Sequence, residues 1–169
     1  MNHEDSFSQT HINNNSPTLK NRLWRYGPPI VWAVLIFIGS SDVLSSSHTS
    51  SFIIRPLHLL FPNASEATLA TIHFIIRKLG HLTEYAILAW LSARALRTSS
   101  QPWLRQRWFW LALSFVACYA LFDEFRQSFV PSRTASIYDS LIDISGGLTM
   151  LLLVAWRRAR QAAGRSSLR

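Results

Sequence analysis

Four long uncharged runs of mostly apolar residues constrain the fold of this chain more than any other feature. They cover Tyr26 to Ser41, Tyr85 to Ala93, Trp108 to Phe122 and Leu148 to Trp156. A helix needs about 20 predominantly apolar residues to cross the hydrocarbon core of a bilayer. Only the first and third runs approach that length, so the second and fourth can span a membrane only if polar neighbours extend them.

The second and fourth runs have upstream extensions that are free of proline, Glu66 to Glu84 and Ile137 to Gly147. Both carry ionisable side chains, namely Arg77, Lys78, His81, Glu84, Asp139 and Asp143. Charges inside a span are costly and usually face the interior of a bundle or a wet cavity. With 49% hydrophobic residues clustered in this way, the sequence predicts an all-α integral membrane bundle of about four transmembrane helices.

The distribution of lysine and arginine predicts the orientation of this bundle, since cytoplasmic segments of membrane proteins collect positive charge. Most of the 17 basic residues lie before the first run, between the second and third, or after the fourth: Lys20, Arg22, Arg25, Arg94, Arg97, Arg105, Arg107, Arg157, Arg158, Arg160, Arg165 and Arg169. We therefore expect both termini to be cytoplasmic. A cleaved signal peptide is not expected, because no A-x-A type site follows the first run.

The chain divides into three predicted parts. Residues 1–22 are rich in polar side chains and are expected to form a disordered tail. Residues 23–156 form the transmembrane domain, and residues 157–169 form a basic cytoplasmic tail that contacts anionic lipid headgroups. We expect membrane lipids and no nucleic acid as partners, and no metal or cofactor. Cys118 is expected to be a small buried hydrophobe, and Tyr85 and Tyr138 to be amphipathic anchors.

Ionisable residues of three predicted helices fall at a common depth. At a rise of about 1.5 Å per residue, Arg77, His81 and Glu84 lie about 15 to 25 Å from an inner boundary at Arg94. The same rise gives about 20 to 25 Å for Asp123, Glu124, Asp139 and Asp143 on the other two helices. Spacings of three and four place each set on one helix face, and Gly146 and Gly147 would let a neighbouring helix approach closely.

Several of these residues carry a resemblance to a known family. They are Arg77-Lys78-Leu79-Gly80-His81 with Glu84-Tyr85, then Asp123-Glu124-Phe125-Arg126-Gln127, then Pro131-Ser132-Arg133, and finally Asp139 followed by Asp143 and Gly146. In this order the set is similar to the VanZ-like family, over roughly Val31 to Trp156. Two positions depart from the family pattern: Asp143 stands where Asn is common, and Met150 stands where a second small residue is common.

The resemblance implies a multi-pass protein of the bacterial plasma membrane, with the charged site on the extracytoplasmic side. The family takes its name from a protein associated with teicoplanin resistance in glycopeptide-resistance clusters. A link to such resistance or to maintenance of the cell envelope is therefore implied, whereas no reaction is.

Recognition of an anionic envelope component is the first interpretation of the charged cluster. Arginine and lysine at the outer face suit the phosphate or carboxylate of a cell-wall precursor or lipid carrier. The expected ligand-binding residues are Arg77, Lys78, His81, Glu84, Asp123, Glu124, Gln127, Arg133, Asp139 and Asp143.

Two alternatives stay open. A membrane-embedded hydrolase or transferase acting on a lipid-linked phosphate would use His81, Glu84 or Glu124 for proton transfer. Arg133 would then stabilise negative charge, and Asp139 with Asp143 could hold a divalent cation. Alternatively, the charges form a structural cluster of salt bridges with no ligand.

Overall fold

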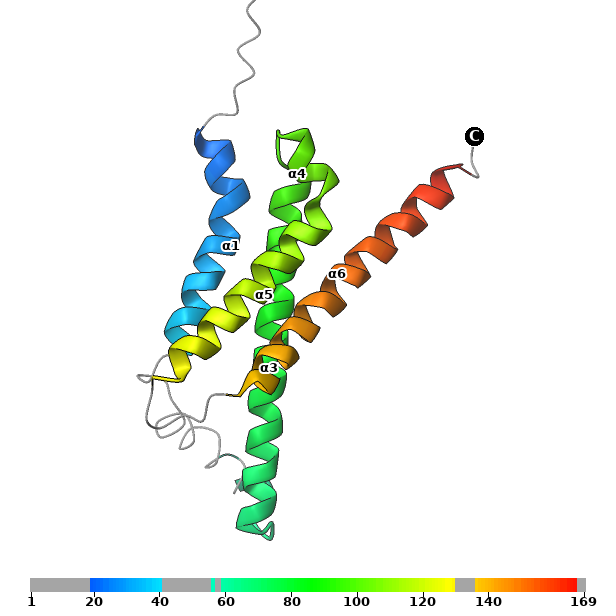
Figure 1. Cartoon of the computed structure of the whole chain (residues 1–169). Helices are drawn as coiled ribbons and strands as arrows, with labels where there is room; N and C mark the ends of the chain where they lie inside the picture. Colours follow the sequence, from blue (N-terminus) through cyan, green and yellow to red (C-terminus); the bar gives the residue numbers. More distant parts are fainter. Residues whose placement is uncertain (1–18, 41–55, 57–58, 130–135, 167–169) are drawn as a thin grey trace, which may run out of the picture.

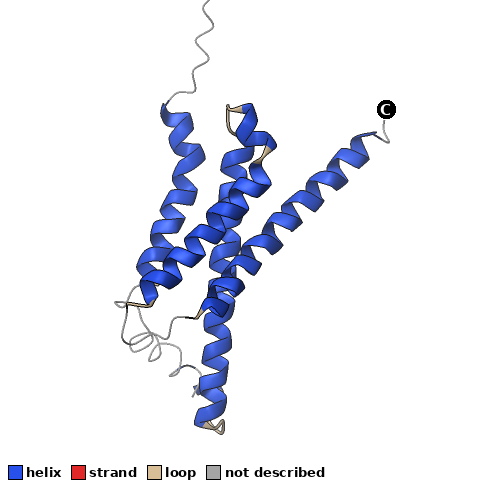
Figure 2. Cartoon of the chain, in the orientation of Figure 1, coloured by secondary structure: helices blue, strands red, loops and turns tan. Residues whose placement is uncertain are grey.

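The computed structural model describes residues 19–40, 56, 59–129 and 136–166, and this part of the chain is helical with short connections (Figures 1 and 2). Its helices are α1 (Leu19–Gly39), α3 (Glu66–Arg97), α4 (Pro102–Gln106), α5 (Trp108–Gln127) and α6 (Ile137–Ser166). No strand occurs in these ranges. The all-helical fold and both polar extensions, which begin at Glu66 and Ile137, are confirmed.

Helix α3 is the central element, and α6, α5 and α1 all pack against it. Helix α6 also packs against α5. Figure 1 shows the start of α1, the short helix α4 and the end of α6 at one end of the bundle. The ends of α1 and α5 and the start of α6 therefore lie towards the other end, where the charged residues were expected.

Local side chains determine where α3 begins and where it ends. The Ser65 hydroxyl caps the helix by accepting a hydrogen bond from the Thr68 backbone N–H at 3.2 Å, and Glu66 lies in the first turn, where the helix dipole favours negative charge. Arg94 and Arg97 occupy the last turn, where the dipole favours positive charge. Both ends of α3 are thus specified by the sequence around them.

The core between the helices is built largely from small and branched side chains. Its most deeply buried members are Tyr85, Leu88, Ala89, Ala112, Val116 and Leu151. Alanine and glycine at helix contacts let backbones approach closely enough for dispersion contacts along the whole interface.

Gly146 and Gly147 fix the distance between α6 and its neighbours. A Cβ atom at Gly146 would collide with the Leu82 backbone oxygen and come within 3.0 Å of its Cγ, while one at Gly147 would come within 2.6 Å of Val116 Cγ1. The expected close approach at these two glycines is confirmed. It brings the start of α6, with Asp139 and Asp143, against the middle of α3.

Helices α5 and α6 are each long and apolar enough to cross a bilayer. Only 28% of the apolar window of each is buried within the bundle, whereas core helices of soluble proteins are mostly covered. Large apolar side chains are exposed on both, including Phe122, Phe125 and Leu152. Length and composition thus support two of the four expected spans. Helix α6 is long enough because it joins the fourth run to its polar extension, as expected for that run.

The structure extends two helices beyond the expected transmembrane domain and corrects one local expectation. Helix α1 begins at Leu19, inside the segment assigned to the disordered tail, and α6 continues to Ser166 through the basic segment. Cys118 is exposed on the outside of α5, so the prediction of a buried position was wrong. Its neighbours Val116 and Ala120 take the inward face instead, and helix periodicity then turns Cys118 outward.

Candidate functional site

Three helices, α3, α5 and α6, bring polar side chains to one end of the bundle. We call this set the charged layer, and it comprises Arg77, Lys78, His81 and Glu84 of α3, Asp123, Glu124, Arg126 and Gln127 of α5, and Asp139 and Asp143 of α6. Ser40, just after α1, joins them. Arg133, also predicted as a site residue, lies outside the described residues.

Asp123 accepts hydrogen bonds from three side chains and links α1 to α5. Its Oδ1 atom accepts from Ser40 Oγ at 2.5 Å and from Arg126 Nη2 at 2.9 Å, and its Oδ2 atom accepts from Gln127 Nε2 at 2.7 Å. Arg126 also donates to Ser40 Oγ. The Asp123 side chain is only 3% exposed, so these charge-assisted bonds replace its lost hydration. We call these four residues the Asp123 network.

Arg126 is only partly satisfied within this network. Its guanidinium carbon lies 4.4 Å from the Phe37 ring centroid, and its Nη2 atom donates to the Phe37 carbonyl at 3.4 Å. Its Nε atom is buried and has no hydrogen-bond partner in the described part of the chain. This buried donor is therefore unsatisfied within the described residues.

A second set of contacts joins α3 to α6. The Lys78 ammonium forms an ion pair with Asp139, and Lys78 also lies 5.2 Å from the Phe74 ring centroid. One helical turn further in, His81 Nδ1 lies 3.8 Å from Asp143 Oδ1. That distance is too long for a hydrogen bond but close enough for electrostatic attraction if the imidazole is protonated.

Glu124 organises the start of α6. Its Oε1 atom accepts a hydrogen bond from the Ser136 backbone N–H, immediately before the helix begins at Ile137. Asp139 lies in the first turn of the same helix, where negative charge interacts favourably with the dipole. Two acidic residues expected to contact a ligand thus also position α6.

Tyr85 and Glu84 lie at the inner edge of the charged layer. Tyr85 is fully buried, so its predicted role as an interfacial anchor was wrong, whereas Tyr138 is 73% exposed. The Tyr85 hydroxyl has no hydrogen-bond partner among the described residues. The backbone oxygen of Glu84 accepts from Trp32 Nε1 at 2.9 Å.

Sequence reasoning missed the contributions of α1 and of Tyr119. Ser40 and Trp32 bind the charged layer from α1, and Tyr119 donates to the Ala33 carbonyl at 2.5 Å. The signal that could have found Ser40 was weak, because a polar residue that ends an apolar run is ordinary at any membrane boundary.

The described residues contain no group of three His, Cys, Asp or Glu side chains arranged to hold a metal ion. Asp139 is engaged by Lys78 instead, and Asp143 lies beside His81. Within the described residues the layer therefore contains ion pairs, a partly unsatisfied arginine and a buried hydroxyl.

An all-helical bundle with two helices long and apolar enough to cross a bilayer is typical of a membrane protein. The family model described as VanZ/LLP1 matches residues 28–158, and the chain belongs to this family. The predicted resemblance is therefore confirmed. No curated protein and no solved structure matches the chain.

Proposed function

We propose that α1, α3, α5 and α6 all cross the bacterial plasma membrane, with both termini in the cytoplasm and the charged layer facing outward. The arginine-rich segments flank the start of α1, the α3–α5 connection and the end of α6, which Figure 1 places at one end of the bundle. Positive charge of this kind is retained in the cytoplasm. Lys78 of α3 is compatible with a span because its partner, Asp139, lies on α6.

Cysteine labelling in intact cells tests this orientation. In a Cys118→Ser background, Ser128→Cys should react with a membrane-impermeant maleimide, because exposed Ser128 follows α5 at the outer end. Ser100→Cys, exposed between α3 and α4, should react only after lysis. Labelling of Ser100→Cys in intact cells would contradict the orientation.

We propose further that the charged layer recognises an anionic component of the cell envelope, such as a lipid-linked cell-wall precursor or a lipid carrier. The observation that carries this proposal is the incomplete pairing of the outer cations. Arg126 keeps a buried Nε donor without a partner, and Arg77, half-buried on α3, has no ion pair among the described residues. Guanidinium groups with free donors bind phosphate and carboxylate oxygens well.

The ion pairs of the layer set how such a ligand would bind. A phosphate that contacts Lys78 must compete with Asp139, which already neutralises that ammonium. Asp139→Asn should therefore increase affinity for an anion, because the amide frees the cation while keeping the side-chain shape. A purely structural ion pair would show lower stability without a gain in affinity.

Native mass spectrometry with a polyprenyl monophosphate as the probe tests recognition. We expect retention by the purified protein, about tenfold weaker retention in Arg77→Ala, and stronger retention in Asp139→Asn. Arg94→Ala is the matched control, since it removes the same charge from the opposite end of α3. Equal loss in Arg77→Ala and Arg94→Ala would contradict a site in the charged layer.

A link to teicoplanin resistance or envelope maintenance rests on the same proposal. If binding underlies such a role, Arg77→Ala should change teicoplanin sensitivity at unchanged protein abundance, while Arg94→Ala should not. Release of phosphate from the probe, abolished by His81→Ala, would favour the enzymatic alternative instead.

A further inference from the structure

Two arginines from different helices converge on one tryptophan at the end of the bundle opposite the charged layer. The guanidinium carbon of Arg97, in the last turn of α3, lies 5.6 Å from the Trp108 ring centroid. That of Arg158 on α6 lies 5.9 Å from the same ring. Trp108 is the first residue of α5 and is only 8% exposed, so three helices meet at this point, which we call the Trp108 site.

The positive charge at this site lacks a carboxylate partner within the described ranges. Neither arginine has an ion pair there, and the nearest acidic residues along the three helices, Glu84, Asp123 and Asp143, lie about 20 Å or more away by helix rise. The Nε atom of Arg97 is buried and has no hydrogen-bond partner among the residues that the structure describes. Arg158 is exposed and Arg97 is half-buried, so an anion that joins the two like charges and the unsatisfied donor would stabilise the site.

The backbone at the start of α5 adds to the positive electrostatic potential of the Trp108 site. Helix α5 begins here without a side-chain N-cap, so N–H groups of its first turn lack helical acceptors and carry the positive end of the helix dipole. Burial and, to a smaller extent, the neighbouring charge of Arg158 lower the pKa of Arg97 below its ordinary value. Guanidinium remains protonated at any physiological pH.

We propose that Arg97, Arg158 and the start of α5 form a binding site for a phosphate group, supplied either by the headgroup of an anionic phospholipid or by a free phosphate compound. Two planar guanidinium forks can each donate paired hydrogen bonds to phosphate oxygens. Trp108 holds both side chains in place through cation–π contact. This site is separate from the charged layer and does not rest on the function proposed for it.

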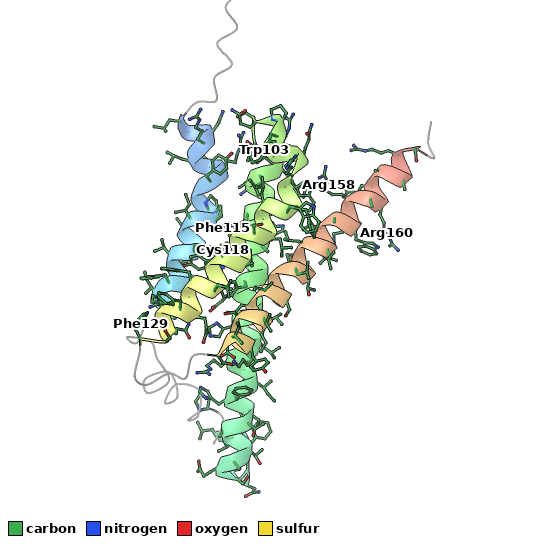
Figure 3. The ribbon with its side chains drawn as sticks, viewed as in Figure 1. Trp103, Phe115, Cys118, Phe129, Arg158 and Arg160 are labelled. Carbon is green, nitrogen blue, oxygen red and sulfur yellow. The ribbon has the colours of Figure 1, made fainter. Side chains whose placement is uncertain are left out.

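Arg160 provides a matched control on the same helix. Its guanidinium carbon lies 4.1 Å from the Trp156 ring centroid, so it makes the same kind of contact with a single tryptophan and without a second arginine. Figure 3 labels Arg158 and Arg160 along the C-terminal half of α6. If the attraction to anionic lipid is non-specific, loss of Arg158 and loss of Arg160 should weaken it equally. If the Trp108 site binds phosphate specifically, loss of Arg158 should weaken binding more than loss of Arg160.

The test uses the full chain in nanodiscs of phosphatidylcholine containing a small fraction of phosphatidylglycerol, with bound lipid counted by native mass spectrometry. We expect one retained phosphatidylglycerol, and a loss of retention of roughly tenfold or more in Arg97→Gln and Arg158→Gln, with little change in Arg160→Gln. Arg97→Lys, which keeps the charge but not the fork, should show an intermediate loss even if Arg97→Gln fails to fold.

A second arm distinguishes the two sources of phosphate. In nanodiscs of phosphatidylcholine alone, inorganic phosphate should raise the melting temperature of the wild type but not that of Arg158→Gln if the site takes free phosphate compounds. Retention of phosphatidylglycerol without this shift assigns the site to the lipid headgroup. Equal lipid loss in Arg158→Gln and Arg160→Gln, or no binding in either arm, would overturn the proposal.

Discussion

Lys78 of α3 and Asp139 of α6 form an ion pair that closes the outer end of the interface between these two helices. Their side chains are 16% and 32% exposed, so the pair is neither fully solvated nor fully buried. Its position above the glycine contact at Gly146 means that packing and charge fix the same pair of helices.

The first prediction concerns this ion pair. A double-mutant cycle with Lys78→Met and Asp139→Asn should give a coupling free energy of about 1 kcal/mol, the usual range for partly exposed or intramembrane polar pairs. Thermal or denaturant unfolding in a mild detergent would measure it. Coupling indistinguishable from zero would mean that the pair does not hold α6 to α3.

The second prediction concerns the Asp123 network. Asp123→Ala should lower the free energy of unfolding by about 3 kcal/mol, because the half-buried Arg126 guanidinium loses its counter-charge. Adding Arg126→Met should recover part of that loss, since no unpaired cation then remains. A cost in Asp123→Ala of less than about 0.5 kcal/mol, the range of surface substitutions, would speak against a structural role.

The third prediction concerns helix packing. Gly147→Ala should destabilise the protein by about 1 to 3 kcal/mol, because the new Cβ would meet Val116 Cγ1 at 2.6 Å. Gly80→Ala is the control, since nothing lies within 4 Å of a Cβ there. Alanine should instead stabilise that helical position by up to about 1 kcal/mol. Equal changes in stability in Gly147→Ala and Gly80→Ala would show that α6 can move away from Val116 to make room for the new side chain.

The fourth prediction compares two tyrosine hydroxyls. Tyr119→Phe should cost about 1 kcal/mol, because it removes the hydrogen bond to the Ala33 carbonyl. Tyr85→Phe should be neutral or stabilising by about 1 kcal/mol, since its buried hydroxyl has no partner among the described residues. Melting temperatures of the two variants, measured side by side, show whether each substitution stabilises or destabilises the protein. A large loss in Tyr85→Phe would indicate that its hydroxyl is hydrogen-bonded in the working protein.

Much of the fold could be predicted from the chain alone. The polar extensions at Glu66 and Ile137 were recognised because they lack proline and keep helical spacing, and both begin helices. The common depth of His81, Asp123 and Asp143 followed from the fixed rise of a helix. The small residues at Gly146 and Gly147 indicated a close contact, which the bundle contains.

The tertiary structure decided which of these groups meet. Helical spacing fixes the angles between side chains on one helix, but not how that helix is rotated against its neighbours. Packing at Gly146 and Gly147 sets that rotation for α6, so Lys78 meets Asp139. The same kind of packing turns Tyr85 inward and Cys118 outward. Ser40 donates a hydrogen bond to Asp123 from a distant part of the chain. No local sequence pattern could predict this contact.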